Sequence, residues 1–395
     1  MQTANLNTLQ PSMRWYGPHD VVPLVHLKQA GCEGVVSALH AIPVGEVWST
    51  AAIIAHRSLI EEAGMVWEVV ESLPVHEDIK RRSGNCEAYL ENYRQSLRNL
   101  SACGIKVVTY NFMPLLDWVR TEVSRELPNG AKALYFNHDE FAIFDLFLLQ
   151  RPGAEEEYAP EEITRLRVKF QEMSEATRQR IFHNVLLGLP GSDDAFTPEI
   201  VLAELKKYEG VGEEELRSNL IHFLEAVTPT AEEVGIKMAI HPDDPPFPVL
   251  GLPRIVKTEA DIAKFLDAVP SPANGLCFCT GSLGARQDND LVAMARRFGS
   301  RVHFLHLRNT LRDEEGNFME AEHLGGNTDM YALMKEWVAL MQREGRRIPM
   351  RPDHGHQILD DLEKTTYPGY SAIGRLKGLA ELRGLEYAVA QSTGS

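Results

Sequence analysis

Four residues that can bind a metal ion each close a short apolar run with the composition of a buried β-strand: His241, Cys279, His306 and Asp353. Two imidazoles, a thiolate and a carboxylate form a donor set for a divalent transition metal. Singly, a histidine in such a place is more often an ordinary hydrogen-bonded residue, and a lone cysteine is usually a small buried apolar side chain. Because four such residues close four successive runs, the pattern predicts one shared metal site.

The densest group of reactive side chains is the segment Arg351-Pro352-Asp353-His354-Gly355-His356. Polar residues also close other apolar runs, among them Arg308 and Asn111, and we expect these two to bind substrate. Arg308 could form two parallel hydrogen bonds with a substrate carboxylate, or a salt bridge within the protein. Asn111 could equally be a surface residue. Cys277 lies on the same side of its run as Cys279 but nearer the start, which favours core packing.

Elements that would position these residues recur along the chain. Apolar runs alternate with helical patterns, and glycines such as Gly31, Gly64 and Gly104 follow the helices. This alternation is typical of parallel strands with helical crossovers. We expect eight strands, at 14–17, 34–39, 65–71, 105–112, 236–241, 276–280, 302–307 and 348–351. Eight such strands form a (β/α)₈ barrel of the α/β class, in which catalytic residues lie at the C-terminal ends of the strands.

Neighbouring strands lie about 4.8 Å apart, so ligands at four adjacent strand ends can reach one ion. The alternation breaks between about residues 115 and 215, a charged and mostly helical stretch. We interpret this stretch as an insertion after the fourth strand of a single barrel domain spanning 1–395. Lys132 to Asn137 is the one place within it that favours a short strand.

Composition narrows the class of protein. The net charge of −16 argues against a nucleic-acid partner, which requires a basic surface. No apolar run approaches the roughly 20 residues of a membrane span, and residues 1–20 lack the pattern of a secretory signal. The odd count of five cysteines, most of them far apart in the sequence, does not indicate a disulfide framework. We therefore expect a cytoplasmic protein with a small-molecule substrate and no membrane partner.

Longer motifs carry a resemblance to a known family. The chain resembles mannonate dehydratases over nearly its whole length, through Arg14-Trp15-Tyr16-Gly17, Tyr110-Asn111-Phe112-Met113-Pro114, His241-Pro242-Asp243-Asp244-Pro245-Pro246, Cys279-Thr280-Gly281-Ser282, His306-Leu307-Arg308, Arg351-Pro352-Asp353-His354-Gly355-His356 and Pro368-Gly369-Tyr370.

The resemblance implies a xylose-isomerase-like barrel that dehydrates D-mannonate to 2-dehydro-3-deoxy-D-gluconate in hexuronate breakdown. It implies Mn²⁺ or Fe²⁺ at the four ligand positions, and acid/base roles for His354 and Tyr370. The donor set alone leaves zinc open, because a thiolate suits a softer ion. We also expect a homo-oligomer, a dimer or larger. The alternatives are a metal-dependent sugar isomerase or epimerase on the same barrel, and a non-catalytic sugar-acid-binding protein.

Overall fold

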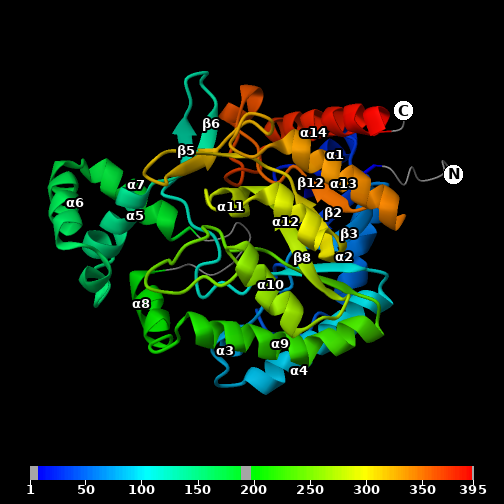
Figure 1. The fold of residues 1–395 in the computed structure, drawn as a ribbon, viewed down its shortest axis with the longest axis horizontal. Helices are drawn as coiled ribbons and strands as arrows, with labels where there is room; N and C mark the ends of the chain where they lie inside the picture. Colours follow the sequence, from blue (N-terminus) through cyan, green and yellow to red (C-terminus); the bar gives the residue numbers. More distant parts are fainter. Residues whose placement is uncertain (1–7, 188–196, 394–395) are drawn as a thin grey trace.

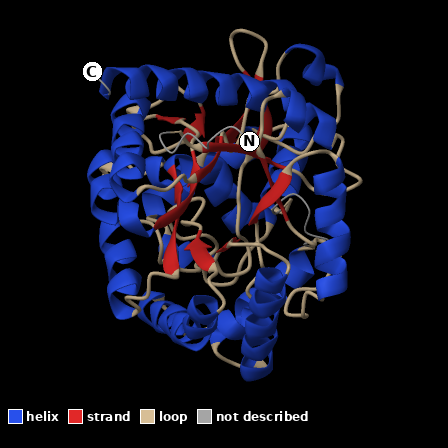
Figure 2. Ribbon diagram, turned by 90° about the vertical axis from the view of Figure 1, so that its right-hand side faces the viewer, coloured by secondary structure: helices blue, strands red, loops and turns tan. Residues whose placement is uncertain are grey.

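Eight parallel strands form a closed barrel in the computed structural model, which describes residues 8–187 and 197–393. In order around the barrel these are β1, β12, β9, β8, β7, β4, β3 and β2 (Figure 2 shows helices surrounding them). Their bounds are Gln10–Arg14 (β1), Gly34–Ser37 (β2), Val66–Val70 (β3), Val107–Tyr110 (β4), Lys237–Ile240 (β7), Asn274–Cys279 (β8), Val302–His306 (β9) and Pro349–Arg351 (β12). The predicted barrel and the order of its strands are confirmed.

Helices follow the strands, and most of them pack on the outside of the barrel, whereas the short α11 (Thr280–Gly284) lies at the end of β8 beside the cavity. The others are α1 (Leu24–Gln29), α2 (Thr50–Glu62), α3 (Glu77–Arg81), α4 (Cys86–Ala102), α9 (Glu213–Glu233), α10 (Glu259–Ala268), α12 (Leu291–Phe298), α13 (Met330–Glu344) and α14 (Ala372–Thr393). Local signals fix their ends. Ser49 caps α2 by accepting a hydrogen bond from the Ala52 backbone N–H, and Gly64 follows the helix with a φ of 75° that favours glycine.

Apolar side chains fill the interior of the barrel. One buried layer consists of Val36, Val69, Val107, Ala239, Cys277 and Phe304. Cys277 is fully buried there, and burial raises the pKa of its thiol well above the usual 9.0. This agrees with the expectation that Cys277 packs in the core.

The first strand differs from its prediction. It covers Gln10–Arg14 rather than 14–17, and Ser12 pairs with Gly34 on the neighbouring strand. The aromatic residues Trp15 and Tyr16 follow the strand instead of forming it. Residues 10–13 contain a proline and no β-branched residue, so their composition carries little strand signal. The consequence is that Arg14 lies at the strand's C-terminal end.

The segment expected as an insertion is mainly helical but also carries a hairpin. It contains β5 (Glu122–Glu126), β6 (Lys132–Phe136), α5 (His138–Ile143), the π-helical turn η1 (Phe144–Leu148), the 3-10 turn η2 (Ala154–Glu157), α6 (Pro160–Glu172), α7 (Glu175–Val185) and α8 (Pro198–Lys206). Figure 1 shows α5, α6 and α7 standing to one side of the barrel. The strand β5 was not expected, because its polar sequence lacks the apolar alternation of a half-buried strand.

A second sheet joins this segment to the barrel. It is antiparallel, with strand order β10-β11-β6-β5. The strands β10 (Thr310–Arg312) and β11 (Phe318–Glu320) belong to the loop that follows β9. Phe318 pairs with Phe136, and their rings stack 5.5 Å apart. The insertion therefore holds the loop after β9 in place.

Among the helices of residues 8–187 and 197–393, none combines the length and the apolar character that a membrane crossing requires.

Candidate active site

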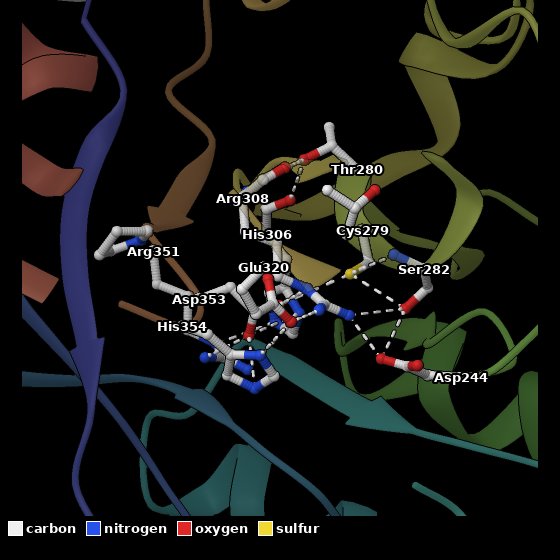
Figure 3. Close-up of polar contacts among 12 residues, drawn as sticks. Asp244, Cys279, Thr280, Ser282, His306, Arg308, Glu320, Arg351, Asp353 and His354 are labelled. Atoms are coloured by element: carbon white, nitrogen blue, oxygen red, sulfur yellow. Dashed lines mark hydrogen bonds and ion pairs between the residues drawn. The ribbon is translucent and has the colours of Figure 1, made fainter. Parts of the chain in front are cut away.

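Three of the expected metal ligands meet at adjacent strand ends. His241 directly follows β7, Cys279 ends β8 and His306 ends β9. One ligand atom from each lies within 4.8 Å of the other two. Asp353, two residues after β12, joins them: its Oδ1 is 3.7 Å from Nδ1 of His306, and its Oδ2 is 3.7 Å from Sγ of Cys279. Figure 3 shows Cys279, His306 and Asp353 converging from different elements.

The thiolate of Cys279 suits a cation, whereas His241 must lose a proton before it can bind one. Burial alone would raise the pKa of Cys279, but Arg308 and His241 outweigh it, so the pKa falls well below the usual 9.0 and the thiolate is favoured. Burial lowers the pKa of His241, yet the Cys279 thiolate and other anions raise it to about 9. A thiolate is the form of cysteine that binds metals. Nδ1 of His241 lies 2.6 Å from the Pro242 carbonyl oxygen, which leaves Nε2 as its ligand atom. The residues present therefore fit a divalent metal ion.

Asp353 is held in an unusual backbone conformation. Its φ is 61°, in the left-handed region that non-glycine residues rarely adopt. Adjacent residues of a regular strand face opposite sides, whereas Asp353 and His354 both line the same cavity. Ion pairs of 2.6 Å to Arg351 and to Arg308 fix the carboxylate. Burial would raise the pKa of Asp353, but Arg351, His354, His306 and Arg308 together hold it well below 3.8.

His354 and Tyr370 are neighbours in this cavity. Their rings pack edge to face with centroids 5.0 Å apart. The backbone N–H of Gly355 donates to the Gly369 carbonyl at 2.9 Å, which draws the two parts of the loop together. Gly369 has a φ of 80°, and a Cβ there would lie 3.1 Å from the His354 ring. A glycine before Tyr370 therefore permits the close approach of the two side chains.

Glu320 is a member of this group that sequence reasoning missed. It ends β11, and its Oε1 lies 3.0 Å from Nδ1 of His354. Its carboxylate also pairs with Arg308, and Nη2 of Arg120 is 3.5 Å away. Burial would raise the pKa of Glu320, but Arg308 and His354 outweigh it and hold the pKa at about 2. Glu320 lies in a polar stretch without strand periodicity, so the sequence offered no signal for it.

The two expected substrate-binding residues both line the cavity. The guanidinium of Arg308 pairs with Asp244, Glu320 and Asp353. The side-chain amide of Asn111 donates to Asp117 at 3.2 Å. The salt-bridge alternative for Arg308 is thus present, and the substrate roles of both residues stay predictions.

The cavity at the strand ends has His241, Asp353, His354 and Tyr370 in its lining. Several buried lining atoms have no hydrogen-bond partner among the described residues: Arg14 Nε, Glu71 Oε2, Tyr110 Oη and Trp118 Nε1. Leaving such atoms unpaired is costly. A polar ligand that carries both hydrogen-bond donors and acceptors would supply partners for them.

Comparisons with known proteins identify sequences similar to this chain over nearly its whole length. The family model described as D-mannonate dehydratase (UxuA) matches residues 9–394. A mannonate dehydratase of Marinomonas sp. (strain MWYL1) is 51% identical over 387 residues, which cover 96% of this chain and 98% of the relative. A mannonate dehydratase of Chromohalobacter salexigens is 51% identical over 388 residues, which cover 97% of this chain and 99% of the relative.

Solved structures agree with the sequence comparisons. The crystal structure of mannonate dehydratase from Streptococcus suis serotype 2 superposes with a TM-score of 0.78 and 35% identity, covering 98% of this chain and 95% of that one. A xylose isomerase-like TIM barrel protein from Mycobacterium smegmatis superposes with a TM-score of 0.51 at 14% identity, covering 99% of each chain. The latter likeness concerns the fold alone and confirms the expected barrel type.

Proposed function

Because this chain belongs to the D-mannonate dehydratase family, we propose that it is a hydro-lyase that converts D-mannonate to 2-dehydro-3-deoxy-D-gluconate and water. The observation that carries the proposal is the placement of His354 and Tyr370 in the cavity where His241, Cys279, His306 and Asp353 converge. Proton-transfer groups and a metal-binding group then face one substrate.

The reaction requires two proton transfers. A proton leaves C2 of the aldonate, and the hydroxyl group at C3 leaves as water after it is protonated. One base and one acid meet these needs, and each supplies about 10²–10⁴-fold. His354 and Tyr370 are the titratable side chains placed to fill the two roles. Their rings are 5.0 Å apart, so both can reach adjacent carbons of one substrate.

Removal of the C2 proton adds charge next to a carboxylate that is already negative. A divalent cation held by His241, Cys279, His306 and Asp353 would act as a Lewis acid that stabilises this charge. We propose Mn²⁺ or Fe²⁺, a choice that rests on the family resemblance. The arginines Arg308 and Arg351 beside Asp353 add positive potential to the same end of the cavity.

Glu320 holds His354 for this chemistry. Its carboxylate accepts a hydrogen bond from Nδ1 of His354, which leaves Nε2 of the imidazole for proton transfer. Despite its burial, Arg308 and His354 hold the pKa of Glu320 at about 2, so Glu320 faces the imidazole as a carboxylate. We further propose that Arg308 and Asn111 contact the substrate from their positions in the lining.

The insertion contributes residues to the active-site cavity. Trp118, from its start, lines the cavity, and Arg120 pairs with Asp244 at 2.7 Å. We therefore propose a single domain, 1–395, with the insertion over about 115–215 as a part of its active site. A role in hexuronate breakdown, a cytoplasmic location and assembly into a homo-oligomer are further proposals. The pathway and the assembly rest on the family resemblance, and the location rests on the composition of the chain.

A direct assay tests the function. Purified protein is incubated with Mn²⁺ and D-mannonate, and the formation of a 2-keto-3-deoxy acid is measured. Parallel reactions contain ketoses and aldoses as substrates for an isomerase or epimerase. We expect product from D-mannonate alone. Interconversion of the sugars without dehydration of D-mannonate would refute the proposal.

A further inference from the structure

A second group of metal-binding side chains lies outside the barrel, on the helices α4 and α9. Figure 1 shows these helices side by side below the barrel, and Tyr93 packs on Phe223 between them with ring centroids 5.0 Å apart. Cys86 and Glu87 open α4, and His222 lies within α9. One ligand atom from each of the three lies within 4.8 Å of the other two. None of the three lines the active-site cavity.

The histidine has a feature that points to a ligand. Its Nε2 is buried and has no hydrogen-bond partner among the described residues. The nearest acidic atom is Oε1 of Glu87, at 3.7 Å, which is too far for a hydrogen bond. Buried polar atoms usually have a hydrogen-bond partner, and this nitrogen has none within the described residues, so it is free to bind a ligand.

The separation of the His222 and Glu87 ligand atoms is close to that in a tetrahedral zinc site. Zinc binds nitrogen and oxygen at about 2.0–2.2 Å, which places two such ligands about 3.3–3.5 Å apart. The separation of 3.7 Å between His222 and Glu87 needs only a small contraction. Cys86 is buried, whereas Glu87 is exposed and can adjust. Burial raises the pKa of the Cys86 thiol above the usual 9.0, so a metal must displace its proton on binding.

We propose that Cys86, Glu87 and His222 form a zinc site, with water as the fourth ligand, that links α4 to α9. Sulfur, nitrogen and oxygen donors together suit Zn²⁺ better than Mg²⁺ or Ca²⁺, which prefer oxygen alone. Because the ligands come from two helices on the outside of the barrel, the bound metal stabilises their packing and takes no part in the dehydration.

Zinc content per chain tests the proposal. The full-length protein is stripped with a chelator, equilibrated with excess Zn²⁺, freed of unbound metal by gel filtration and analysed for zinc. We expect two zinc ions per chain for the native protein, one at each site. Cys86→Ser and His222→Asn should each hold one. The matched control is Cys103→Ser, which changes a buried cysteine at the other end of α4 and should still hold two.

Two further measurements keep the test independent of folding and of the active site. Cobalt titration of the native protein should give sulfur-to-cobalt absorption at two equivalents, half of it lost in Cys279→Ser. With Mn²⁺ at the active site, Cys86→Ser should dehydrate D-mannonate at the native rate. The second site would be overturned if the native chain bound one zinc ion and lost it only in Cys279→Ser. It would also be overturned if Cys86→Ser still bound two zinc ions.

Discussion

The contact between Glu320 and His354 can be tested by removing one charge. Glu320→Gln keeps the size of the side chain and an oxygen that can accept from Nδ1 of His354, which lies 3.0 Å away in the native protein. It removes the negative charge that the buried imidazole faces. A hydrogen bond to a charged group contributes about 1.5–3 kcal/mol, and one between neutral groups about 0.5–1.5 kcal/mol.

The difference of about 1–2 kcal/mol corresponds to a loss of about 5- to 30-fold in kcat. The upper limit is the whole contribution of one acid or base, about 10²–10⁴-fold, if the imidazole turns away. KM and metal content should change little, because the ligand residues remain. The control is Glu322→Gln, two residues further along, which removes a half-exposed carboxylate paired with Lys377 and should keep native kcat.

A double-mutant cycle gives the sharpest form of this test. If Glu320 acts through His354, then Glu320→Gln should cost almost nothing further in a His354→Asn background. Arg308 and Arg120 keep Asp244 as a partner in the variant, so the fold should be retained. Circular dichroism and thermal unfolding check this. Native kcat in folded Glu320→Gln, or a loss that multiplies with that of His354→Asn, would refute the reasoning.

Three other outcomes are expected. Removal of metal by a chelator should abolish turnover, and added Mn²⁺ should restore it; full activity in protein shown to be metal-free would contradict this. Cys279→Ser replaces a thiolate with a neutral hydroxyl, so metal content should fall while circular dichroism stays native; unchanged affinity would show that Cys279 is not a ligand. Burial raises the pKa of Glu386 to about 7, above the unfolded value of about 4.3. Its protonated form therefore stabilises the fold at low pH, and that stability is lost as pH rises through 7. We compare how far the free energy of unfolding in urea falls between pH 4 and pH 8. The fall should be about 3 kcal/mol smaller in Glu386→Gln than in the native protein. An equal fall in both proteins would contradict the assignment.

The barrel could be predicted because its signals are local. Buried parallel strands read as continuous apolar runs, and helix ends carry their own marks, such as Ser49 at the start of α2. The strand β1 was misplaced because residues 10–13 are buried by their neighbours without having strand-forming side chains. The strands β5, β10 and β11 are short and mostly polar, and the pairing of β11 with β6 joins segments far apart in the chain, which local periodicity does not reveal.

Some residues of the candidate site could be predicted from the sequence and others could not, for the same reason. His241, Cys279, His306 and Asp353 could be singled out because strand ends of a barrel meet on one face, a consequence of topology alone. Glu320 could not, since its place depends on the pairing of β11 with β6 from the insertion. The left-handed backbone at Asp353, which turns His354 into the same cavity, is likewise a product of tertiary contacts. The catalytic and ligand roles of these residues stay predictions.

The central claim is that His354 and Tyr370 carry the two proton transfers. It is tested most directly by exchange of the C2 hydrogen of D-mannonate in deuterated solvent, measured for His354→Asn and Tyr370→Phe with metal content verified. We expect both variants to keep the metal and to lose about 3–5 kcal/mol of transition-state stabilisation. The variant without the base should show no exchange, whereas the variant without the acid can still exchange if deprotonation is reversible. Near-native turnover in both variants would contradict the account.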